Sequence, residues 1–314
     1  MRLSRWPVGR VAAAIALGLA LAGCATPPTD ALRATPPPIP ASVLLESVPF
    51  FSQDAYQCGP ASLAMALAAT GAGVTPEALR EQVYLPDRLG SLQAEMLATA
   101  RRHGRLAVPL APRLEEVLRE VADGRPVIVL QNLSLPIAPV WHYAVVIGYD
   151  LERGDVLMHS GTRAAMALPL AVFERTWSRS GFWSMVATVP ARLPRTPGTD
   201  VLLHAAAALE RVDPVAAGSA YGAIVVRAPS ALAGWIGLGN TRFRSGDAAG
   251  AALAFRRATE IDPQSPEAWN NLALAELGSG RRDEARVAVE RAIALGGAHH
   301  ERYRQTLARI DASR

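Results

Sequence analysis

Residues 48–67 read VPFFSQDAYQCGPASLAMAL, and this stretch is the one most informative about the fold. Its second half is an apolar run of Ala, Leu and Met that follows Cys58-Gly59-Pro60 and leads to glycines at 71 and 73. Proline suits the first turn of a helix and glycine its end, so the sequence predicts a helix that begins at Cys58. A thiol at that position lies beside free backbone N–H groups, which favour the nucleophilic thiolate. The alternative, a small buried core cysteine, fits poorly with an adjacent Gly-Pro.

A nucleophilic cysteine needs a base and an oxyanion donor. Of the six histidines, His142 opens the strand-like stretch WHYAVVIGYD at 141–150, and a strand holds an imidazole ring rigidly. Gln53 lies five residues before Cys58, so its amide and the Cys58 backbone N–H can stabilise a developing oxyanion. Gln57 is the less favoured alternative donor, because a residue next to the nucleophile usually points elsewhere.

Residues 46–192 combine helical and strand patterns. Amphipathic helices are expected at 92–102 and 114–122, and a short helix capped by Thr75 precedes them. Apolar, β-branched runs at 126–131, 143–148 and 156–158 predict strands. Helices followed by strands indicate an α+β domain with an antiparallel sheet, and Phe173 and Trp177 are expected in its core.

From about residue 198 the chain becomes Ala-rich and repeats itself. The pattern that begins at Trp235 returns 34 residues later at Trp269, and a degenerate earlier copy spans 198–231. The period and residue types resemble the tetratricopeptide repeat, so residues 193–314 are expected to form an all-α repeat domain that ends in a capping helix from about His299. Such repeats bind a protein or peptide partner in their concave groove.

Three segments together resemble a known peptidase family: residues 48–67, RPVIVLQ at 125–131, and WHYAVVIGYD at 141–150. They are similar to the papain-like cysteine peptidases that cut double-glycine leaders from bacteriocin precursors, especially the stand-alone bacterial members. The resemblance covers about residues 46–192. It implies Cys58 as nucleophile, His142 as base, Gln53 as oxyanion donor, and peptide or protein substrates that end in small residues such as Gly-Gly.

One departure concerns the acid that orients the base. The family has an Asp at the end of the strand after the histidine strand, where this sequence reads DVLMHSG at 155–161. His159 or Ser160 takes that place, and His159 joins the candidate catalytic residues with Ser160 as the open alternative. Neither is an anion at neutral pH, although either can accept a hydrogen bond.

The N-terminus predicts an export signal with a lipid anchor. Three arginines lie within the first ten residues, and residues 11–22 form an apolar run that is too short to span a bilayer. The sequence Leu21-Ala22-Gly23-Cys24 that ends this part resembles a bacterial lipoprotein box. We therefore expect a signal peptide at 1–23, a lipidated Cys24 and a Pro-rich tether at 24–45. Ala25 after the cysteine resembles outer-membrane retention, with the domains facing the periplasm.

Composition excludes several other classes. The net charge is +4, but Arg2, Arg5 and Arg10 in the signal account for three of these charges, so no basic patch supports nucleic-acid binding. No spacing of His and Cys suggests a metal, and no glycine-rich loop suggests a phosphate cofactor. The leading hypothesis is a lipid-anchored cysteine peptidase. A peptide-binding lipoprotein that has lost turnover is the main alternative, and a cell-wall amidase or transglutaminase-like enzyme is the third.

Overall fold

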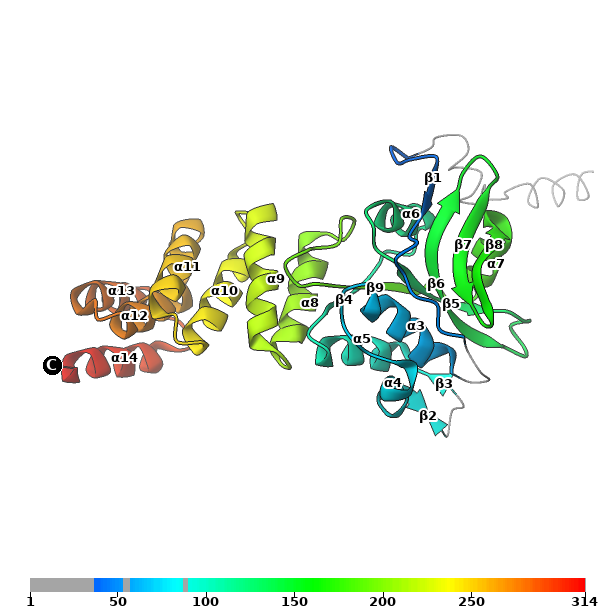
Figure 1. Ribbon diagram of the computed structural model, residues 1–314. Coiled ribbons are helices and arrows are strands. Elements are labelled where there is room, and N and C mark those ends of the chain that lie inside the picture. Colours follow the sequence, from blue (N-terminus) through cyan, green and yellow to red (C-terminus); the bar gives the residue numbers. More distant parts are fainter. Residues whose placement is uncertain (1–36, 53–56, 87–89, 314) are drawn as a thin grey trace, which may run out of the picture.

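The computed structural model describes residues 37–52, 57–86 and 90–313. The expectations for Gln53 and for the N-terminal segment with Cys24 lie outside these residues. The described part consists of an α+β domain followed by a row of helices, as Figure 1 shows. The predicted fold class is therefore confirmed.

An antiparallel sheet forms the centre of the first domain. Within the described residues it has seven strands in the order β4-β9-β5-β6-β7-β8, with β1 paired to β6. The strands are β1 (Ser42–Leu44), β4 (Leu106–Pro109), β5 (Val127–Asn132), β6 (Trp141–Asp150), β7 (Asp155–Ser160), β8 (Arg163–Pro169) and β9 (Ser184–Thr188). A small hairpin of β2 (Tyr84–Leu85) and β3 (Gly90–Ser91) lies apart from it.

Helices cover both faces of this sheet, so its central strands are apolar on both sides. Along β6, Tyr143 and Val145 pack into one core and Ala144 and Val146 into the other, as the alternation of strand side chains requires. The helices are α3 (Cys58–Ala68), α4 (Pro76–Val83), α5 (Gln93–Arg102), α6 (Leu114–Ala122) and α7 (Leu170–Ser178). The face with Tyr143 packs on α3, α4 and α5, and the other face packs on α6 and α7.

The second domain is a series of helices whose two clear repeats make the same contact. The indole Nε1 of Trp235 donates to the carbonyl of Pro229 at 2.8 Å, and that of Trp269 donates to Pro263 at 3.0 Å. This equivalence confirms the 34-residue period in three dimensions. The helices are α8 (Thr199–Glu210), α9 (Pro214–Arg227), α10 (Leu232–Arg244), α11 (Ala248–Ile261), α12 (Pro266–Gly278), α13 (Arg282–Leu295) and α14 (His300–Ala312).

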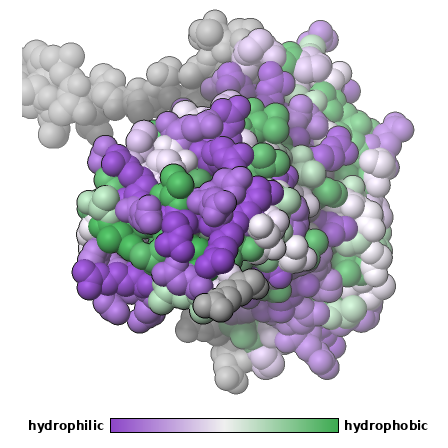
Figure 2. All heavy atoms as spheres, turned by 90° about the vertical axis from the view of Figure 1, so that its left-hand side faces the viewer, coloured by the Kyte–Doolittle hydropathy of each residue, from purple (hydrophilic) through white to green (hydrophobic). Residues whose placement is uncertain are grey.

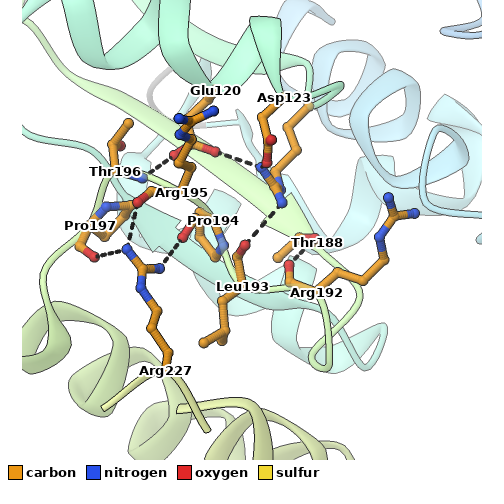
Figure 3. Close-up of polar contacts among 11 residues, drawn as sticks. Glu120, Asp123, Thr188, Arg192, Leu193, Pro194, Arg195, Thr196, Pro197 and Arg227 are labelled. Atoms are coloured by element: carbon orange, nitrogen blue, oxygen red, sulfur yellow. Dashed lines mark hydrogen bonds and ion pairs between the residues drawn. The ribbon is translucent and has the colours of Figure 1, made fainter.

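The two domains share a core and a pinned linker. Leu202 and Leu209 of α8 belong to the same buried cluster as Val108 of β4. In the linker, the N–H of Thr196 donates to the buried carboxylate of Glu120 at 2.6 Å, and Arg227 donates to the carbonyls of residues 194, 195 and 197 (Figure 3). The repeats are therefore fixed against the sheet by packing and by polar contacts.

Among the described residues, no helix has the length and apolar character needed to cross a membrane.

Candidate active site

Cys58 is the first residue of α3, where the predicted helix begins. The helix can start this close to the rest of the domain because residue 59 is glycine: a Cβ at that position would collide with the Ser91 side chain of β3. Pro60 follows in the first turn and is buried. The Gly-Pro pair thus allows the helix N-terminus, and the thiol on it, to be inserted between β3 and the sheet.

The thiol of Cys58 lies at the edge of β6. On β5, Leu130 is paired with Tyr143, and its N–H points away from β6 and donates to the carbonyl of Trp183. The two residues are therefore a pair without mutual hydrogen bonds, and the N–H of Tyr143 points away from β5, toward the side of β6 on which β7 lies. Because β7 is paired with β6 only from Val145 onward, β7 does not bind the N–H of Tyr143. That N–H donates to the Cys58 sulfur instead. The nucleophile candidate is therefore held against the residue that follows His142.

Burial and hydrogen bonding act on the Cys58 thiol in opposite directions. Burial is the larger effect and raises the pKa of Cys58, while backbone N–H groups of Tyr143, Gly59 and Cys58 itself lower it. The helix N-terminus thus supplies the donors expected from the sequence, but burial outweighs them. The thiol is protonated in the resting protein at neutral pH.

His142 lies at the start of β6, half-buried, and its partner is Ser160. The ring Nε2 and the Ser160 Oγ are 2.9 Å apart. Burial lowers the pKa of His142, so the ring is neutral at neutral pH. In the tautomer with its proton on Nε2, the ring donates to the hydroxyl and Nδ1 has the free lone pair of a base. Among the described residues, no hydrogen bond joins this ring to the Cys58 thiol.

His159 lies on the other face of the sheet and does not contact His142. It is paired with Val145, its Nε2 lies 3.2 Å from the carbonyl of Val48, and its Nδ1 accepts from the N–H of Ala165 at 3.1 Å. The ring also packs 5.2 Å from Phe50. Both nitrogens are occupied by backbone groups, so of the two residues left open by the sequence, Ser160 is the one that lies against the His142 ring.

The sequence did not identify Tyr143 as a contact of Cys58. Its N–H donates to the thiol, its ring meets Trp183 edge-on at 5.7 Å, and its hydroxyl donates to the carbonyl of Ser91 at 3.2 Å. The one feature of the sequence that pointed to this contact is the position of Tyr143 directly after His142. Gln53, the expected oxyanion donor, lies outside the described residues.

Comparison with known proteins identifies both domains. Residues 45–185 match the peptidase C39-like family, and residues 202–266 and 242–310 match tetratricopeptide repeat families. The chain carries a peptidase C39-like domain followed by tetratricopeptide repeats. The C39-like domain contains Cys58 and His142, and the repeats imply protein or peptide binding. No curated protein matches the chain.

Solved structures resemble the two domains separately. A C39-like peptidase from Bacillus anthracis is 20% identical over 50% of this chain and 99% of its own, with a TM-score of 0.40. The repeats are similar to MamA, at 21% identity over 36% of this chain with a TM-score of 0.34. The chain spans 62% of that MamA structure. The Sgt2 repeat domain from Aspergillus fumigatus is 26% identical over 37% of this chain and 78% of its own, with a TM-score of 0.34.

Proposed function

We propose that this protein is a cysteine peptidase that cleaves peptide bonds with Cys58 as nucleophile and His142 as general base. The observation that carries the proposal is the placement of the Cys58 thiol, at a helix N-terminus, on the N–H of the residue next to His142. The match of residues 45–185 to a peptidase family supports the same reading.

The chemistry requires one proton to move between these two side chains. As the Cys58 sulfur forms a bond to the substrate carbonyl carbon, His142 takes the thiol proton, and the carbonyl oxygen becomes an oxyanion that the Cys58 backbone N–H can stabilise. The C–N bond then breaks and His142 returns the proton to the leaving amine. Water, deprotonated by His142, hydrolyses the remaining thioester and restores the free thiol.

The pKa directions determine the resting state of the pair. Cys58 has a raised pKa and His142 a lowered pKa, so both are neutral at pH 7, and the thiol loses its proton only as attack begins. Protonation of His142 removes the base. Cleavage is therefore retained down to pH values below the ordinary histidine pKa of about 6.5 and is lost as the pH falls through the lowered value.

The repeat domain supplies a surface for a protein or peptide partner, and the N-terminus supplies the membrane anchor. The repeats expose Val226, Leu253 and Val287, and the view onto the repeats in Figure 2 has apolar areas between polar side chains. Such areas suit a protein or peptide partner. The signal-like residues 1–23 and Cys24 support a lipid anchor at the outer membrane facing the periplasm. The tether expected at 24–45 is shorter than the sequence indicated, because Ser42–Leu44 form β1 and pair with β6, so it ends before residue 42.

The test is Cys58 alkylation by iodoacetamide and cleavage of fluorescein-labelled casein, measured in a Cys24→Ser background where Cys58 is the only thiol. We expect Cys58→Ala to abolish cleavage, and His142→Ala to abolish it and to slow alkylation at pH 7 by about tenfold or more. His299→Ala, an exposed histidine on the repeats, is the matched control and leaves both rates unchanged. Alkylation that is indifferent to His142 contradicts the Cys–His pair.

A catalytically inactive peptide-binding lipoprotein is the second candidate function. The observation that favours it is the hydroxyl of Ser160, rather than a carboxylate, at the His142 ring. In that case Cys58→Ser keeps every partner that the wild-type chain retains on affinity capture, and the wild-type chain cleaves neither casein nor the captured partner. A peptidase instead traps its substrate through Cys58→Ser and releases fragments as wild type.

A further inference from the structure

The turn between β5 and β6 exposes a run of apolar side chains. Within nine positions, Leu133, Leu135, Ile137, Val140 and Trp141 are 50%, 60%, 91%, 54% and 52% exposed. Single exposed apolar residues are common on protein surfaces, whereas a contiguous group marks a surface that binds something. We call residues 133–141 the apolar turn.

Hydrogen bonds with Asn132 and Arg179 hold the backbone of the apolar turn. The side-chain oxygen of Asn132, which is only 2% exposed, accepts from the N–H of Ser134 at 3.0 Å and of Val140 at 2.9 Å. Arg179 donates to the carbonyls of Asn132 and Ser134. Proline at 136 and 139 restricts the backbone further. A surface ordered in advance loses little entropy on binding, so this arrangement suits a recognition element.

The apolar turn leads directly into the active site. Trp141 and Tyr143 lie two residues apart on β6 and therefore point to the same face of the sheet, which is the face covered by α3. The N–H of Tyr143 donates to the Cys58 sulfur, so the half-exposed indole of Trp141 stands at the thiol end of the strand. In Figure 1 the β5–β6 turn extends beyond the sheet at the end where α3 begins.

We propose that the apolar turn, with Trp141 nearest the thiol, is the subsite that binds a large apolar side chain of the substrate, on the second residue before the scissile bond. The proposal rests on the peptidase function above. Its occupant is an extended peptide with Leu, Ile or Phe at that position. Residues 133–141 contain no charged side chain, so nothing in the subsite favours a charged substrate residue there. The apolar turn runs directly into the part of β6 that contacts Cys58, and this position favours a substrate as its occupant over a second copy of the chain or a lipid surface.

The experiment compares two probes that differ in one side chain. Acetyl-Leu-Gly and acetyl-Gly-Gly chloromethyl ketones alkylate a thiol in the same way: an S–C bond forms, the C–Cl bond breaks, chloride leaves, and His142 takes the thiol proton. We expect the Leu probe to react with Cys58 about ten times faster than the Gly probe, and Trp141→Ala to bring the ratio close to one. Trp141→Leu, which remains apolar, retains part of the preference.

The matched control is Val212→Ser, which removes a similarly exposed apolar side chain (49%) between α8 and α9. This variant keeps the wild-type ratio. Each rate is divided by the iodoacetamide rate of the same variant, so a general change in thiol reactivity cancels. A wild-type ratio near one, or a preference that Trp141→Ala does not change, overturns the subsite.

The outcomes separate this proposal from the peptidase function. If both probes react in a His142-dependent manner at equal rates, only the subsite fails. If neither reaction depends on His142, the peptidase function fails. If Ile137→Ser removes binding to phosphatidylcholine vesicles, or converts a dimer to a monomer in sedimentation, while the ratio stays unchanged, the apolar turn is a lipid or self-association surface and the proposal is wrong.

Discussion

At the level of single residues, the partner of His142 is decided by strand alternation. His159 and Ser160 are neighbours on β7, so their side chains point to opposite faces of the sheet. Ser160 shares the face of His142, whereas His159 lies among Val48, Phe50 and the backbone of β8. A register difference of one residue exchanges the two, and the sequence alone does not fix that register. The choice left open by the sequence therefore needed the structure.

Substitutions of Ser160 test the proposed base His142, either by adding a negative charge at the ring or by removing the hydrogen bond to it. Ser160→Asp places a carboxylate at the ring, which favours the imidazolium and raises the pKa of His142 by about one pH unit or more, as followed by NMR titration of the ring. Ser160→Ala removes one neutral hydrogen bond, worth about 1 kcal/mol, so we expect about a fivefold loss in the rate of casein cleavage.

His159→Gln is the control for these variants. It disturbs the bonds to Val48 and Ala165 and so lowers the melting temperature, but it leaves the titration of His142 in place. If Ser160→Asp does not move that titration, or if Ser160→Ala cleaves casein as fast as wild type, the hydroxyl does not orient the ring.

At the level of elements, local pattern predicted those parts of the fold that are locally encoded. The helix at Cys58, the helices at 93–102 and 114–122 and the strands β5, β6 and β7 follow from periodicity and caps, and Phe173 and Trp177 are buried as expected. Strand β9 was not predicted. It lies between β4 and β5 and is paired with residues more than 50 positions away, so its place depends on contacts that no short window contains.

The repeats illustrate why small residues carry the 34-residue pattern. A Cβ at Gly239 of α10 would stand 2.5 Å from the Phe255 ring of α11, so the two helices approach this closely only because residue 239 has no side chain. Gly222 of α9 has open space where its Cβ would stand. The same residue type therefore has a packing role in one helix and none in the other.

Replacing each glycine by alanine separates these roles. Gly239→Ala overpacks the α10–α11 contact, and we expect a loss of about 1–3 kcal/mol in the free energy of unfolding. Gly222→Ala removes a flexible residue from a helix interior without a collision and is expected to stabilise by about 0.5–1 kcal/mol. Urea unfolding followed by circular dichroism measures both. Equal effects of the same sign contradict the packing role of Gly239.

At the level of the whole molecule, a single peptide group in the linker is hydrogen-bonded to both domains. The carbonyl of Arg195 accepts from Arg227 of α9 at 2.5 Å, and the N–H of Thr196 donates to Glu120 of α6 at 2.6 Å. Both polar groups of the Arg195–Thr196 peptide are thus bonded, one to the repeats and one to the C39-like domain. Because α8 also shares its core with β4, a partner on the repeats is held at a fixed position relative to the peptidase domain.

Trypsin cuts after arginine, so cleavage between Arg195 and Thr196 reports the opening of this junction. Arg227→Ala removes the donor to the carbonyls of residues 194, 195 and 197, and charge-assisted hydrogen bonds of this kind contribute about 1.5 kcal/mol after allowance for their partial exposure. When opening precedes cleavage, that loss makes the cut about tenfold faster. Arg257→Ala, which breaks an exposed ion pair with Glu260 on α11, is the control and leaves the rate unchanged. Equal rates in wild type and Arg227→Ala would show that the shared core alone fixes the repeats.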